Sequence, residues 1–226
     1  MKLLLLIMEY LGTIAFAISG ASLAIRKGMD YLGVVALGII TATGGGLIRD
    51  IILNRFPAAV FVNKAFAFLA FITSTILFIF LYFNKHILTS KRFYKFELLV
   101  NIFDSIGLGI FTVVGAMVAY HLTPRVGIVL TLFAGVITGV GGGIIRDVCS
   151  LSMPYVFTKH IYASASLFGA IILLFCIPLI GETASTFVSI LFIFIIRLLA
   201  SKYRWNLPKV IMPEHIMASK YNDKIK

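Results

Sequence analysis

Long runs of apolar residues dominate the chain, and charges, prolines and turn-forming residues interrupt them at short intervals. A transmembrane helix needs about 20 mostly apolar residues. By this measure the pattern predicts seven spanning helices. Their approximate ranges are 3–25, 32–53, 64–84, 98–121, 126–150, 160–180 and 183–200. The connection between the last two is very short, so we expect them to form a tight helical hairpin.

The composition agrees with a lipid-facing surface. Hydrophobic residues make up 60% of the chain and charged residues only 13%, whereas a soluble domain keeps about a quarter of its residues charged. The fold class that follows is an all-α membrane protein. The segment after Lys2 resembles a signal peptide, but because it recurs later in the chain we expect it to be the first spanning helix.

The basic residues predict an orientation rather than a nucleic-acid partner. The net charge is +11, but Lys and Arg cluster in short loops and in the last residues. Of the 20 Lys and Arg, five fall on the side of residue 1 and fifteen on the other side. The positive-inside rule therefore predicts a multi-pass protein of the inner (plasma) membrane, with the N-terminus outside and the C-terminus inside. Residues 201–226 would form a basic cytoplasmic tail near anionic membrane lipids.

A seven-residue motif occurs twice. Gly44-Gly45-Gly46-Leu47-Ile48-Arg49-Asp50 returns 97 residues later as Gly141-Gly142-Gly143-Ile144-Ile145-Arg146-Asp147. The match extends outward, for example to Glu9 with Asp104, Gly12 with Gly107, Phe16 with Phe111, Gly20 with Gly115, and Val60-Phe61 with Val156-Phe157. We interpret residues 1–90 and 91–181 as two three-helix units and 182–200 as a seventh helix. Because three is odd, the second unit enters the membrane inverted, which is typical of transport proteins.

The glycine triplets are the first candidate site. Each glycine inside a helix costs about 1 kcal/mol relative to alanine, so we expect helices two and five to bend or break there, near the bilayer midplane. Irregular backbone at that depth is tolerated only inside protein or along a wet cavity. The alternative is that the glycines only permit close helix packing. Two symmetric triplets beside charged residues favour the functional interpretation.

Threonines precede both triplets. Thr41 and Thr138 are repeat mates, and Thr43 lies directly before Gly44. Their hydroxyl groups either line a pore or bond back to the carbonyl four residues earlier. The sequence leaves both interpretations open.

Charged residues form the second candidate site. Each triplet is followed by an Arg-Asp pair, Arg49-Asp50 in the first copy and Arg146-Asp147 in the second. Charges near the hydrocarbon seldom face lipid, and Glu9 and Asp104 lie at depths that match the two arginines. We therefore expect two ion pairs, Glu9 with Arg49 and Asp104 with Arg146. They act either as structural clamps or in permeation.

The doubled motif resembles that of the prokaryotic branch of the trimeric intracellular cation (TRIC) channels, whose bacterial members are also described as glycine transporter domains. The resemblance covers roughly residues 5–200. It implies a homotrimer with one pore per protomer, in which helices two and five, kinked at the glycines, line a path for K⁺ and other monovalent cations such as Na⁺. Animal members carry a lysine-rich signature where this chain has Arg49-Asp50, so we do not expect their lipid regulation.

The sequence is compatible with three classes of function. A monovalent cation channel needs a continuous wet path, whereas a carrier for glycine or another small amino acid needs an occluded site with two gated states. The third class is an intramembrane enzyme or a purely structural protein. We expect no enzyme, because no catalytic motif is present. We also expect no cofactor and no metal site beyond the permeating cations.

Overall fold

The computed structural model describes residues 1–84, 86–89, 92–122, 127–158 and 161–205, which fold into helices joined by short turns. Four long helices form the centre: α1 (Lys2–Arg26), α2 (Tyr31–Ile52), α6 (Arg92–Leu122) and α7 (Ile128–Cys149). Two long helices flank them, α4 (Ala65–Phe83) and α9 (Ala163–Tyr203). The short helices are α3 (Ala59–Val62), α5 (His86–Thr89) and α8 (Tyr155–Thr158).

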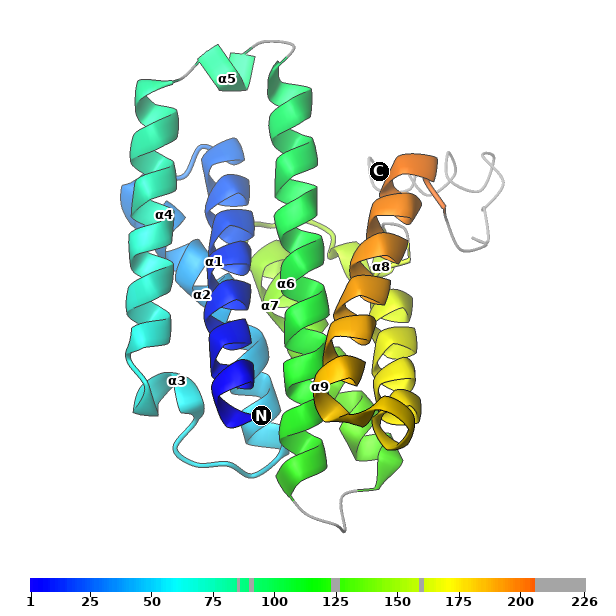
Figure 1. Ribbon diagram of the computed structural model, residues 1–226. Helices are drawn as coiled ribbons and strands as arrows, with labels where there is room; N and C mark the ends of the chain where they lie inside the picture. Colours follow the sequence, from blue (N-terminus) through cyan, green and yellow to red (C-terminus); the bar gives the residue numbers. More distant parts are fainter. Residues whose placement is uncertain (85, 90–91, 123–126, 159–160, 206–226) are drawn as a thin grey trace, which may run out of the picture.

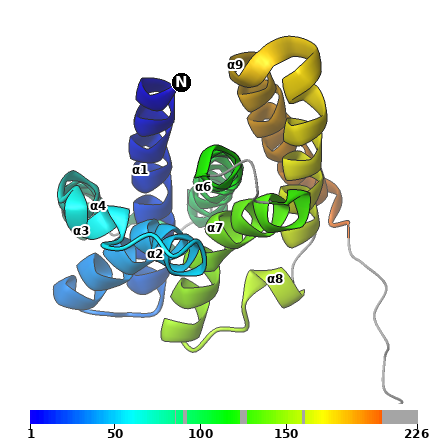
Figure 2. The ribbon, with the colours of Figure 1, turned by 90° about the horizontal axis from the view of Figure 1, so that it is seen from below.

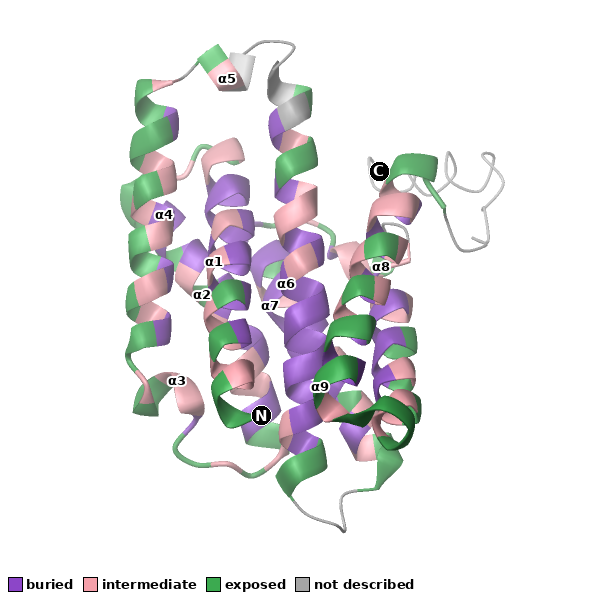
Figure 3. Ribbon diagram, viewed as in Figure 1, coloured by how far each residue is buried: buried purple, intermediate pink, exposed green. Residues whose placement is uncertain are grey.

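The core lies around α6. In the most apolar stretch of α6, 78% of the residues are buried, compared with 22% in α4. Seen from below, α4 covers one side of the central helices and α9 the other (Figure 2). Exposed residues line the outer faces of both, and buried residues gather on α1, α6 and α7 (Figure 3). The exposed faces carry large apolar side chains such as Phe68, Phe83 and Phe175, as expected of a surface that contacts lipid tails.

Within the described residues, six helices are long and apolar enough to cross a membrane. The last of them, α9, is interrupted at Gly181, whose backbone angles (φ 79°, ψ 165°) are not helical. The chain reverses direction there (Figure 1), so α9 has a first arm (163–180) and a second arm (182–203). The predicted ranges 160–180 and 183–200 fall on these two arms. Only residues up to 205 of the predicted tail belong to the described part of the chain.

The two copies of the sequence motif meet at the centre of the bundle. Helices α1 and α6 carry matching residues and run in opposite directions (Figure 1). Helices α2 and α7 cross at the glycine triplets, and their contacts are reciprocal. A Cβ atom on Gly45 would collide with the carbonyl oxygen of Thr138, and one on Gly142 with the carbonyl oxygen of Thr41. We call this crossing the glycine contact.

The expected break in the helices is absent. Residues 44–46 and 141–143 lie inside α2 and α7, both of which are continuous. The missing side chains instead let the two backbones touch, as small residues do between membrane helices. Close packing across the glycine contact offsets the low helix propensity of glycine. The packing interpretation of the triplets therefore describes the structure.

The threonine hydroxyl groups point back along their own helices. Thr41 donates to the carbonyl oxygen of Leu37 (2.6 Å) and Thr138 to that of Ala134 (2.5 Å), and both threonines are completely buried. Thr43 makes the same bond to Ile39 (2.8 Å) but is only partly buried. Of the two interpretations of Thr41 and Thr138, the structure adopts the bond to the carbonyl four residues earlier.

The glycine contact predicts a specific sensitivity to added volume. Gly45→Ala should lower stability by about 1–3 kcal/mol, the usual cost of overpacking, because a methyl group must push the two backbones apart. Gly127→Ala is the control, because nothing lies within 4 Å of its Cβ position. Thermal unfolding of the purified variants in detergent measures the effect. Equal unfolding temperatures for Gly45→Ala and the wild type would contradict it.

Candidate functional site

Four charged side chains surround the start of the short loop after α2. We call them the first cluster: Glu9, Arg49, Asp50 and Arg55. Arg49 donates to Glu9 from Nη1 (3.3 Å) and to Asp50 from Nε (2.9 Å). Arg55 donates to the same Asp50 oxygen (3.4 Å). Arg49 and Asp50 are buried, whereas the Glu9 side chain is 18% exposed. The cluster holds two acids and two arginines, so it is formally neutral.

The equivalent residues of the second copy form the second cluster: Asp104, Arg146 and Asp147, joined by Arg197 from the second arm of α9. Arg146 donates to Asp104 from Nη1 (2.6 Å) and to Asp147 from Nε (2.8 Å). Ser19 adds a bond to the same Asp104 oxygen (3.0 Å). Arg197 lies 3.7 Å from the other Asp104 oxygen. All four charged residues are buried, and the cluster is again formally neutral.

The motif aspartates fasten the segments that follow. The second oxygen of Asp50 accepts a bond from the backbone N–H of Ala59 (2.8 Å), the first residue of α3. Asp147 does the same for Tyr155 (2.9 Å), the first residue of α8. Each motif therefore acts twice: the arginine reaches across to the carboxylate of another helix, and the aspartate holds the returning chain.

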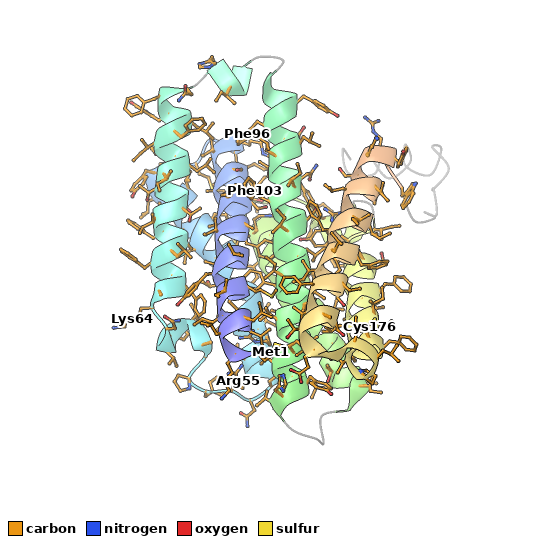
Figure 4. The ribbon with its side chains drawn as sticks, in the orientation of Figure 1. Met1, Arg55, Lys64, Phe96, Phe103 and Cys176 are labelled. Carbon is orange, nitrogen blue, oxygen red and sulfur yellow. The ribbon has the colours of Figure 1, made fainter. Side chains whose placement is uncertain are left out.

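A cavity borders each cluster. The first cavity, of about 30 Å³, is lined by Glu9, Thr43 and Arg49 and by apolar residues that include Phe111. The second cavity, of about 10 Å³, is lined by Ser19, Asp104 and Arg146 together with residues of the far ends of α1 and α6. The two lie toward opposite ends of the bundle. Met1, Arg55 and Lys64 mark the end near the first cavity, and Phe96 lies toward the other (Figure 4).

Two aromatic rings lie between the cavities. Phe16 on α1 and Phe111 on α6 are repeat mates, and their ring centroids are 5.2 Å apart. Both are buried in a small apolar cluster with Ala17, Ala42 and Ala70. Each ring crosses the glycine of the partner helix, Phe16 over Gly107 and Phe111 over Gly12. The charged ends are thus separated by an apolar centre.

The structure brings together both ion pairs that the sequence predicts, Glu9 with Arg49 and Asp104 with Arg146. Thr41, Thr138 and the first two glycines of each triplet lie at the glycine contact, whereas the third glycines, Gly46 and Gly143, lie beside the guanidinium groups of Arg49 and Arg146. Sequence reasoning missed Ser19, Tyr162 and Arg197. A charge inside an apolar run marks a candidate functional residue, so Arg197 carried a signal, but its position near the end of a predicted span concealed it.

Within the described residues, no group of three or more His, Cys, Asp or Glu side chains is arranged to hold a metal ion. The acids of the two clusters are already paired with arginines. Without such a metal site, the two clusters can act only through their charges. Each is a buried network of opposite charges beside a cavity at one end of the bundle.

Comparison with known proteins identifies the family. A family model described as glycine transporter matches residues 6–82 and 101–178. The UPF0126 inner membrane protein YadS of Escherichia coli K12 is 35% identical over 213 residues, covering 92% of this chain and 97% of YadS. YvgT of Bacillus subtilis, a UPF0126 membrane protein, is 34% identical over 202 residues, covering 89% and 94%.

Solved structures give the decisive match. A prokaryotic TRIC channel crystallised in 0.5 M KCl is 36% identical, with a TM-score of 0.81 over 92% of this chain and 100% of that one. The chain belongs to the TRIC family. The TRIC orthologue from Rhodobacter sphaeroides is 28% identical, with a TM-score of 0.78 over 89% and 99%. The resemblance inferred from the doubled motif is thereby confirmed, and the chain is a multi-pass membrane protein and not an enzyme.

The two clusters of this TRIC protein should differ in their contribution to stability. Removing one partner of a fully buried ion pair costs about 3–5 kcal/mol, whereas a partly exposed pair is worth about 1 kcal/mol or less. Asp104→Asn should therefore destabilise the protein far more than Glu9→Gln. The fraction that stays monodisperse after heating in detergent, read by size-exclusion chromatography, measures this. Equal losses would show that burial does not set the difference.

Proposed function

We propose that the protein is a channel for monovalent cations, K⁺ foremost, with one pore in each protomer of a homotrimer in the inner membrane. The observation that carries the proposal is a pair of repeat-related charge clusters, each beside a cavity, at opposite ends of one bundle. Two kinds of relative support it. Solved relatives are named TRIC cation channels or a trimeric intracellular cation channel, and the curated relative of Escherichia coli is an inner membrane protein.

In the membrane, the proposed arrangement has seven spans: two inverted three-helix units and the second arm of α9. The opposite directions of α1 and α6 (Figure 1) and the reversal at Gly181 support it. The end that carries the first cluster faces outside and the end that carries the second cluster faces the cytoplasm. The fifteen-to-five distribution of Lys and Arg favours this orientation.

The proposed path runs from the first cavity to the second along α2 and α7. Thr43 and Arg49 of α2 line the first cavity, and Arg146 of α7 lines the second. Between them the path is closed by Phe16 and Phe111. An apolar constriction excludes water and ions until its side chains separate. Opening therefore requires these two rings to part.

Electrical recording tests the channel directly. Purified protein in a planar bilayer should give discrete current steps under a KCl gradient. Their reversal potential should lie near the potassium equilibrium potential, because the proposed pore passes K⁺ and excludes Cl⁻. Silence in this assay, together with saturable glycine uptake into proteoliposomes, would overturn the channel in favour of a carrier. The description of the matching family model makes the carrier the alternative to test.

The apolar closure makes a second prediction. Phe111→Ala should raise the open probability, because loss of the ring lets water enter between the cavities. Phe175→Ala is the matched control, since its side chain is 71% exposed on the outer face of α9. Single-channel recording of both variants measures the change. An open probability for Phe111→Ala no higher than that of the control would remove Phe111 from the closure.

A further inference from the structure

The second cluster and Tyr162, which packs against its Arg197, contain buried polar atoms that have no hydrogen-bond partner, and the first cluster contains none among the described residues. The atoms are Asp104 Oδ2, Arg146 Nη2, Tyr162 OH and Arg197 Nε. Leaving a buried polar group unpaired costs free energy, and such groups in native proteins often accompany an ion, a water or a functional role. Four of them in one cluster therefore point to a binding function.

The two halves of the protein differ at the positions that surround this cluster. Thr13 and Phe66 line the first cavity. Their counterparts, at the offsets of the sequence repeat, are Leu108 and Tyr162. These counterparts pack in an apolar cluster together with Ile193 from the second arm of α9. Positions that border the first cavity in the first half are therefore packed against an apolar cluster in the second, by an arm that the first half lacks.

Arg197 is the charged residue that this arm contributes to the second cluster. Its guanidinium lies over the ring of Tyr162, 4.5 Å from the ring centre. Its Nη2 atom lies 3.7 Å from Asp104 Oδ2, too far for a hydrogen bond. The other Asp104 oxygen is held at 2.6 Å by Arg146. One oxygen of Asp104 is thus tightly bonded, and the other faces a cation that neutralises it without bonding to it.

We propose that Asp104 Oδ2 and the Tyr162 hydroxyl form a site for a permeating monovalent cation, and that Arg197 occupies it as a tethered substitute. Oxygen atoms of a carboxylate and a hydroxyl are suitable ligands for K⁺ or Na⁺. Asp104 also lines the second cavity, so a cation that enters this cavity would lie beside it. While Arg197 stays near Asp104 the cluster is neutral. When Arg197 withdraws, the cluster carries one negative charge and attracts a cation. This inference rests on the proposed channel function.

The direct test is Arg197→Gln, which removes the charge and keeps most of the side-chain length. In planar bilayers with KCl, the half-saturating K⁺ concentration should fall by about threefold, because a cavity with net negative charge concentrates cations. The reversal potential should also move closer to that of potassium. Arg197→Lys should behave like the wild type. Arg204→Gln is the matched control: it removes the same charge from the exposed end of the same arm.

Two further variants separate the site from a purely structural role. The double variant Asp104→Asn with Arg197→Gln buries no lone charge, and its half-saturating concentration should return to near the wild-type value. Asp104→Asn alone leaves the positive charge of Arg197 uncompensated, and K⁺ conductance should fall by about threefold. A structural role would change the yield of folded protein but not the half-saturating concentration.

The outcomes are distinct for the two proposals. A silent wild-type protein overturns the channel function and the cation site with it. A conducting wild type whose Arg197→Gln variant folds and shows the same half-saturating concentration and reversal potential overturns the site alone. If Arg197→Gln fails to fold, Tyr162→Phe removes the other proposed ligand without changing any charge, and an unchanged half-saturating K⁺ concentration in that variant overturns the site.

Discussion

Where α2 crosses α7, the carbonyl oxygens of Thr41 and Thr138 lie against the glycines of the opposite helix. No side chain separates the two backbones, so the crossing point has little freedom. The threonine hydroxyls bond within their own helices, which leaves the contact free of unpaired hydroxyl groups. The motif arginines follow one turn later on each helix, and the glycine contact therefore sets where both of them lie. The charge clusters and their cavities depend on this one approach.

Each arginine placed in this way would be costly in a hydrocarbon layer, because an isolated buried charge has lost its hydration. The protein meets this cost with carboxylates from two directions. One is the neighbour in sequence, Asp50 or Asp147, and the other comes from a separate helix, Glu9 or Asp104. The same aspartates tie down α3 and α8. At each end, the same network of residues therefore neutralises the arginine and holds the segment that follows the helix.

The network is duplicated, but the protein is not symmetric. The second arm of α9 has no counterpart, and it adds Ile193 and Arg197 to the second half alone. There the cluster is fully buried, whereas at the first cluster Glu9 is partly exposed and lines the first cavity. The duplication produces two equivalent charge clusters, and the second arm of α9, which contacts only the second cluster, makes them different. In a channel that carries ions between two different compartments, such inequality gives each mouth its own chemistry.

Much of this was predictable from the sequence. The apolar runs set the extent of the long helices, because the thickness of the hydrocarbon layer sets the length of a span. The repeat and the ion pairs Glu9–Arg49 and Asp104–Arg146 followed from matched positions and from the cost of a lone charge in lipid.

Only the tertiary structure decided what the glycine triplets do. Propensity, a property of one helix, predicted a break, whereas packing between two helices kept α2 and α7 continuous. The structure likewise decided the role of Arg197, because its partner Asp104 lies on a helix that is distant in sequence. The sequence by itself indicated that the charges of the repeated motif must be buried and paired, because the cost of a lone charge in lipid follows from the residue type alone. Which surfaces meet is a property of the whole bundle, and only the folded chain shows it.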